Sequence, residues 1–137
     1  MSRTAVETAR FTRVFHGQPD QVSRARHEVA RHLSACGCPV TDDVTLIVSE
    51  FAANAVLHSG SRDQFFTVRT ELFPTYVRVE VEDLGGPWQR KPPGDRPHGL
   101  DIISALAGPG NWGTETTGDG DRVVWARLDL PCILEIT

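Results

Sequence analysis

The stretch LIVSEFAANAVLHSG, residues 46–60, decides the fold because it combines a helical apolar pattern with a polar stripe. Glu50, Asn54 and His58 follow at intervals of four residues, so they lie along one side of a helix, with aliphatic side chains on both flanks. A carboxylate, an amide and an imidazole bordered by apolar residues indicate the floor of a cleft. The alternative, that Glu50 and Asn54 only satisfy each other or a loop backbone, is equally compatible with this helix taken alone. The apolar face of the helix contains Val44, Val48, Phe51, Ala52 and Ala55.

The sequence on either side predicts the other elements of one domain. Alternating or helical spacing of apolar residues, together with Gly and Pro punctuation, sets their approximate bounds. Thr41 is expected to cap the helix of the opening stretch, with Asp42 and Asp43 in its first turn. The expected elements are a strand over 10–16, helices over 19–36 and 41–59, an antiparallel pair of strands over 66–72 and 76–83, a Gly/Pro-rich loop over 85–97, a helix over 99–108 and a final strand over 122–130.

This order of elements predicts an α+β fold. Helices grouped beside strands give a two-layer α/β sandwich, with a mainly antiparallel mixed sheet and the helices on one face. We expect residues 1–9 to be a flexible N-terminus and residues 10–137 to form a single domain.

Composition and charge exclude several classes of function. A formal charge of −4 and scattered arginines provide no basic field, so direct binding to nucleic acid is not expected. No apolar run approaches the roughly 20 residues of a membrane span, and the first residues lack a secretory signal, which predicts a cytoplasmic protein. The odd set of Cys36, Cys38 and Cys132 has poor zinc spacing and is expected to be reduced and structural.

Two further segments add to the chemistry of the polar stripe. A carboxylate and an amide oxygen can hold a hard cation such as Mg²⁺, which takes its remaining ligands from water and phosphates. Gly99 comes at the start of the third helix, where free N–H groups and the helix dipole favour an anion. Asp83 ends an alternating strand, and its carboxylate can accept a hydrogen bond from an amino group such as that of adenine. Taken alone, Asp83 is better explained as a turn residue that caps its own loop.

Taken together, Glu50 with Asn54, the DLGG turn at 83–86, the HGLDIISAL helix entry at 98–106 and the GDRVVWARL strand at 120–128 resemble the GHKL ATPases, which have the Bergerat, or histidine kinase-like ATPase, fold. Within that superfamily the chain is most similar to bacterial anti-sigma-factor serine/threonine kinases. SRARHEVARHL, LIVSEFAANAVLHSG and WGTETTGDGDRVVWARL look like landmarks of that subgroup.

The resemblance implies a role for each matching residue. Asn54 would coordinate the Mg²⁺ that bridges the triphosphate of ATP, and Glu50 would act as general base toward a water or a partner's serine hydroxyl. Asp83 would receive the adenine amino group and Gly85 would let the ring approach. Gly99 and Leu100 would lie at the phosphate-facing start of a helix.

The resemblance also implies partners. The acceptor serine or threonine would belong to an anti-anti-sigma protein, a sigma factor would compete for binding, and the chain would form a homodimer. His58 is expected to be a structural hydrogen-bonding residue rather than a catalyst.

Three positions depart from the pattern of these kinases. Pro87 stands at the last glycine of the first glycine box, and Pro97 stands two residues before Gly99, where it removes an N–H. Val123 stands where many relatives have a threonine that helps to bind adenine. Arg90, Lys91 and Arg96 can contribute phosphate contacts or be solvated, and Trp88 can cover the nucleotide or pack on the sheet.

These departures keep a second hypothesis open, a catalytically weak or inactive nucleotide-binding switch that acts through protein binding. A fragment of a histidine kinase is a weaker alternative, because no phosphoacceptor helix precedes residue 10.

Overall fold

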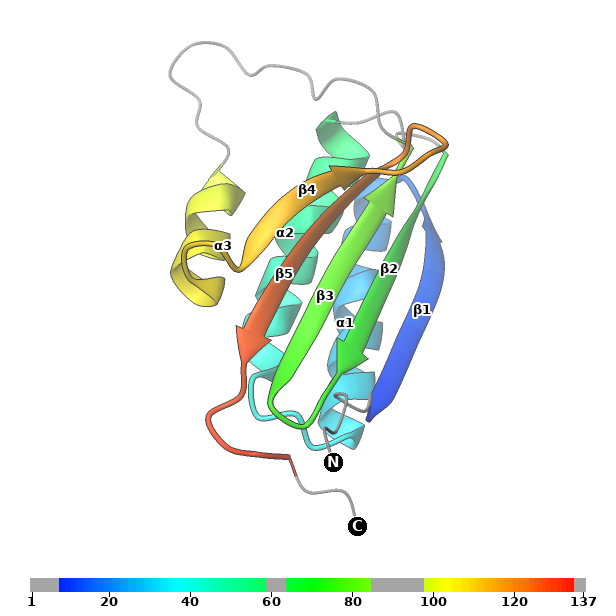
Figure 1. The fold of residues 1–137 in the computed structure, drawn as a ribbon. Helices are drawn as coiled ribbons and strands as arrows, with labels where there is room; N and C mark the ends of the chain where they lie inside the picture. The colour runs from blue at the N-terminus through cyan, green and yellow to red at the C-terminus, as the bar shows by residue number, and fades with distance from the viewer. Residues whose placement is uncertain (1–7, 59–63, 85–97, 135–137) are drawn as a thin grey trace.

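The computed structural model describes residues 8–58, 64–84 and 98–134, which form five strands and three helices (Figure 1). The elements in chain order are β1 (Ala9–His16), α1 (Pro19–Ala35), α2 (Thr41–His58), β2 (Phe65–Leu72), β3 (Tyr76–Asp83), α3 (His98–Ala107), β4 (Trp112–Thr116) and β5 (Arg122–Asp129). The bounds of seven of these elements agree closely with the sequence-based prediction. In the described ranges no helix has the length and apolar character to cross a membrane.

The five strands form one sheet in the order β1-β2-β3-β5-β4. All four pairings are antiparallel, so the parallel pair of the expected mixed sheet does not occur among the described strands. Figure 1 shows the helices together on one face of this sheet. The α+β sandwich predicted from the sequence is confirmed.

One strand was not predicted. Trp112–Thr116 pairs with the beginning of β5 and forms an edge of the sheet, whereas the sequence suggested only a turn there. The segment is short, and its burial pattern shows no buried residue, so it lacks the alternation that identifies β2 and β3. Cross-strand pairing with β5 therefore determines its conformation.

The helix boundaries follow local rules at most ends. Pro19 occupies the first turn of α1, and Gly37 ends it with φ of 75°, a conformation that glycine adopts without steric cost. The expected cap at Thr41 is wrong, because Thr41 is already the first residue of α2 and its Oγ1 donates a hydrogen bond to the Cys38 carbonyl at 2.8 Å. The hydroxyl thus fixes the tight turn between α1 and α2.

The core lies between the sheet and the helices. Residues of β2 and β3 alternate strictly between buried and partly exposed, and the buried set faces the helical layer. Helix α2 buries side chains over about half of its circumference, which fits its contacts with the sheet and with both other helices. The largest fully buried side chains include Phe51, Phe66, Leu33, Ile47, Leu72 and Ile103.

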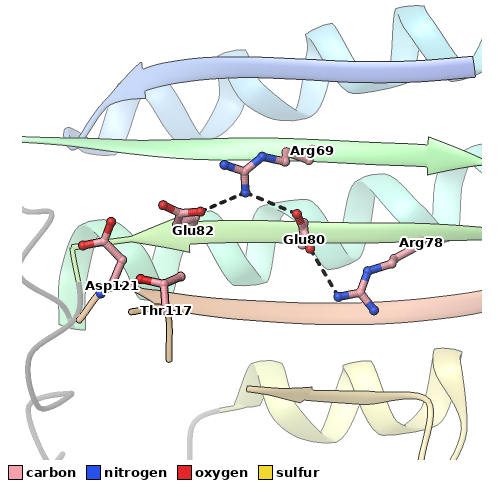
Figure 2. Close-up of polar contacts among 6 residues, drawn as sticks. All are labelled: Arg69, Arg78, Glu80, Glu82, Thr117 and Asp121. Atoms are coloured by element: carbon pink, nitrogen blue, oxygen red, sulfur yellow. Dashed lines mark hydrogen bonds and ion pairs between the residues drawn. The ribbon is translucent and has the colours of Figure 1, made fainter. Parts of the chain in front are cut away.

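The opposite face of the sheet carries a ladder of charges, shown in Figure 2. Arg69 on β2 donates hydrogen bonds to Glu80 at 3.2 Å and to Glu82 at 3.0 Å on β3, and Arg78 donates to Glu80 at 3.2 Å. Burial lowers the pKa of Arg69, but the hydrogen bonds and charges of Glu82 and Glu80 outweigh burial, so the pKa is raised overall. The two cross-strand bonds of Arg69 support the register of β2 and β3 on the side without helices, whereas Arg78 and Glu80 both lie on β3.

Candidate functional site

Helix α2 places Glu50 and Asn54 one turn apart, as the sequence predicts. Both side chains are partly buried, whereas Phe51 and Ala55 on the inner face are fully buried. Leu46 and Leu57 are 42% and 53% exposed, so apolar side chains do border Glu50 on the outer face of the helix. The carboxylate and the amide therefore lie at the boundary between the core and solvent.

The side-chain amide of Asn54 has an unsatisfied atom. Its Nδ2 is buried and has no hydrogen-bond partner within the described residues. A buried amide that is left without a partner costs free energy, typically about 1–3 kcal/mol. The interpretation in which Glu50 and Asn54 merely satisfy each other does not account for this atom, whereas a polar ligand beside α2 would.

Asp83 ends β3 and is only 3% exposed. It shares the helical face of the sheet with Val79 and Val81, because residues two apart on a strand point to the same side. A buried carboxylate at the end of a strand is unusual, since charged groups are seldom fully buried without a specific partner. Its position next to the helical layer distinguishes it from an ordinary solvated turn aspartate.

Helix α3 begins at His98, so Gly99 and Leu100 lie in its first turn. Its other end is fixed to β4, where Trp112 Nε1 donates to Ser104 Oγ at 2.9 Å and Asn111 Nδ2 donates to the Ala107 carbonyl at 2.9 Å. These two bonds hold the C-terminal half of α3 against the sheet. Because the C-terminal half of α3 is held in place, the N–H groups of its first turn also have a fixed position.

The fold brings these elements together on the helical side of the sheet. Helix α2 packs against both β3 and α3, and α3 also contacts β5 (Figure 1). The described residues contain no group of three or more His, Cys, Asp or Glu side chains placed to hold a metal. A cation bound near Asn54 would therefore need ligands from water and from a phosphate-bearing molecule, which is the usual mode for Mg²⁺.

Comparison with known proteins decides the family. Residues 15–116 match the model of the histidine kinase-like ATPase domain. The chain belongs to this family. No match is found among curated proteins. The matched segment includes all six predicted site residues, and the histidine kinase-like ATPase domain is an ATP-binding module of ATPase or kinase type with a regulatory role.

The sheet register corrects the interpretation of Val123. Asp83 pairs with Arg122, whereas Val123 pairs with Glu82 and with Glu115 on the other face. Val123 is therefore on the side of the sheet away from Asp83, and it cannot replace a threonine beside that carboxylate. Arg122, which is partly buried, is the β5 residue opposite Asp83. The sequence does not reveal this neighbour, because a one-residue change of register exchanges the two faces.

Several predicted residues lie outside the described residues. They are Gly85, Pro87, Trp88, Arg90, Lys91, Arg96 and Pro97. The backbone of His58 is described as the last residue of α2 and those of Gly99 and Leu100 as the first turn of α3, but their side chains are not described. The expected adenine contact of Gly85 and the structural role of His58 thus remain predictions.

Proposed function

We propose that this histidine kinase-like ATPase domain is an ATP- and Mg²⁺-dependent serine/threonine kinase that phosphorylates an anti-anti-sigma protein and restrains a sigma factor. The observation that carries the proposal is the buried, unsatisfied Nδ2 of Asn54 one turn from Glu50, a donor that a phosphate oxygen of the nucleotide would satisfy while Oδ1 faces the cation. Buried Asp83 and the first turn of α3 supply the other two contacts that a nucleotide requires. The sequence landmarks of the anti-sigma kinases support the choice of partner.

In this proposal each residue has one chemical task. Asp83 accepts a hydrogen bond from the adenine amino group, and the N–H groups at the start of α3 bind phosphate oxygens. Asn54 supplies one oxygen to Mg²⁺, which when bound neutralises charge on the triphosphate. The partner's hydroxyl oxygen forms a bond to the γ-phosphorus, the bond to the β–γ bridging oxygen breaks, and ADP leaves. Glu50 takes the hydroxyl proton.

Positioning and electrostatics contribute more to this reaction than proton removal. The phosphoryl group carries its charge on peripheral oxygens in the transition state, so fixed N–H groups stabilise it without reorganisation. The attachment of α3 to β4 through Ser104 and Ala107 keeps those donors in place. The partly buried position of Glu50 on the surface of α2 leaves it reachable by a protein substrate.

Transfer of labelled γ-phosphate to a candidate anti-anti-sigma protein tests the proposal. We expect Glu50→Gln to reduce the transfer rate by about 10²–10⁴-fold, the usual contribution of a general base, while ATP binding persists. Asp43→Asn is the matched control, because Asp43 is an exposed carboxylate on the same helix. Full activity in Glu50→Gln would contradict the assigned base.

A second candidate is a nucleotide-binding switch without efficient phosphoryl transfer. Pro87 and Pro97 in the glycine boxes motivated it, and Arg122 opposite Asp83 now adds a cation beside the residue proposed for adenine binding. In this case ATP would bind and alter affinity for a partner, but no phosphate would appear on that partner. The same labelling experiment, run with a binding assay, distinguishes the two functions.

A further inference from the structure

A groove between β1 and α1 lies at the other side of the molecule from β4, because β1 and β4 are the two edges of the sheet (Figure 1). Its volume is about 470 Å³. The proposed ATP-binding residues do not contribute to it. The groove is lined by Phe11, Arg13, Glu28, Arg31, His32 and Ala35.

The segment that forms this groove has a net positive charge, whereas the whole protein has a net negative charge. Residues 8–36 contain five arginines and two carboxylates, although the whole chain has a formal charge of −4. Arg13 forms an ion pair with Glu28, and Arg24 approaches the same Glu28 oxygen at 3.9 Å, so one carboxylate is shared by two arginines. Arg31 forms no ion pair with any residue that the structure describes. The groove thus has uncompensated positive charge.

The interior of the groove is aromatic rather than charged. The rings of Phe11 and His32 have their centroids 5.5 Å apart, and His32 Nε2 is 3.9 Å from Cys36 Sγ. Burial lowers the pKa of His32, which keeps the imidazole neutral near pH 7. Glu28 Oε2 is buried and accepts no hydrogen bond from the described part of the chain. The groove therefore offers an apolar floor beside its arginines.

Strand β1 adds a second means of binding along the same groove. Its eight residues pair with β2 on one side only, and no described strand lies on its other side. A free strand edge presents N–H and C=O groups that can pair with an extended peptide. Exposed Val14 of β1 and exposed Phe65 of β2 line a separate cavity near the end of β1, and both alternate to the face of the sheet away from Phe11 and Arg13.

We propose that the groove between β1 and α1 docks an extended, acidic segment of a partner protein, which adds to the free edge of β1. Carboxylates of the segment meet Arg13 and Arg31, and an apolar side chain packs on Phe11 and His32. A peptide fits better than a nucleic acid, because an extended peptide can pair its backbone with the free edge of β1, whereas a phosphodiester backbone cannot. The proposal is independent of the proposed kinase activity.

Fluorescence anisotropy with a labelled peptide tests whether the groove binds an extended acidic segment. The peptide is as long as β1, and glutamate alternates with valine along it. We expect binding to the full chain, and we expect Arg31→Glu to raise Kd by about tenfold or more. Arg26→Glu is the matched control, since Arg26 is exposed on α1, undergoes the same change of charge and does not line the groove. Circular dichroism spectra and the denaturant midpoint of each variant establish that the fold is intact.

Three altered peptides separate the parts of the proposal. The version with lysine in place of glutamate should not bind. Of two versions N-methylated at the odd-numbered or the even-numbered residues, the one whose blocked N–H groups face β1 should show a Kd raised by about tenfold or more, because it cannot form the strand pairing. Equal weakening by Arg26→Glu, binding of the lysine peptide, or undiminished binding of both N-methylated forms would overturn the proposal. Tighter binding of a single-stranded oligonucleotide of equal charge would also overturn it and reassign the surface to nucleic acid.

Discussion

Asp83 and Arg122 are directly opposite each other in the β3–β5 ladder, on the face of the sheet that the helices cover. This pair places a cation beside the buried carboxylate proposed to bind adenine. Opposite charges at a cross-strand position stabilise each other, and burial strengthens the interaction relative to a solvated pair. The arrangement makes Arg122 a residue of the candidate site.

We predict that Arg122→Thr weakens ATP binding by at least about tenfold, equivalent to about 1.4 kcal/mol, because Asp83 loses the positively charged residue opposite it in the ladder. Val123→Thr should leave the Kd unchanged, since Val123 is on the opposite face. Isothermal titration calorimetry with ATP measures both values. A tighter complex in Val123→Thr would show that the register assigned to β5 is wrong.

Asn54→Ala should remove the dependence of ATP affinity on Mg²⁺. The amide supplies the proposed protein ligand, so the variant should bind ATP with the same Kd whether Mg²⁺ or excess chelator is present. Ser49→Ala is a suitable control, because the Ser49 hydroxyl on the same helix only donates to the Thr45 carbonyl. A wild-type response to Mg²⁺ in Asn54→Ala would move the cation site elsewhere.

Phe51→Ala should lower the free energy of unfolding by about 3–5 kcal/mol, the usual cost of deleting a buried aromatic ring. Phe51 is 1% exposed and anchors α2 in the core, whereas Leu57 on the same helix is 53% exposed. Leu57→Ala should therefore change stability by less than about 1 kcal/mol. Urea denaturation followed by circular dichroism compares the two, and similar losses would contradict the assigned orientation of α2.

Stability should depend on pH through His32. Burial lowers the pKa of His32 from its ordinary value of 6.5, so the unfolded chain binds this proton more readily than the folded chain. The stabilising contribution of neutral His32 to the free energy of unfolding is fully present above about pH 6.5. It decreases as the pH falls toward the lower pKa that His32 has in the folded state. Replacing His32 with Asn should therefore reduce the change in the free energy of unfolding with pH in this range. The control His27→Asn, on the same helix, should keep the pH dependence of the wild type.

Much of the fold follows from the sequence because its signals are local. The alternation in β2 and β3, Pro19 and Gly37 around α1, and the apolar pattern of α2 each determine their element with little help from the rest of the chain. Strand β4 was missed because its residues do not alternate, and its pairing with β5 is a long-range interaction.

The candidate site was predictable in part. The spacing of Glu50 and Asn54 fixes their relation on any helix, and the end of an alternating strand locates Asp83. The neighbour of Asp83 depends on the register between β3 and β5, which no local pattern encodes, and Arg122 was therefore overlooked. The unsatisfied Nδ2 of Asn54 likewise depends on packing and appears only in the folded chain.

Titration calorimetry of the wild type and Asp83→Asn with Mg²⁺ and ATP tests whether ATP binds at Asp83. Glu82→Gln is the matched control, because its carboxylate is adjacent in sequence but pairs with Arg69 on the open face of the sheet. We expect wild type and Glu82→Gln to bind ATP with micromolar Kd, about −8 kcal/mol, and Asp83→Asn not to bind it. Equal ATP affinity in wild type and Asp83→Asn would contradict the proposed site.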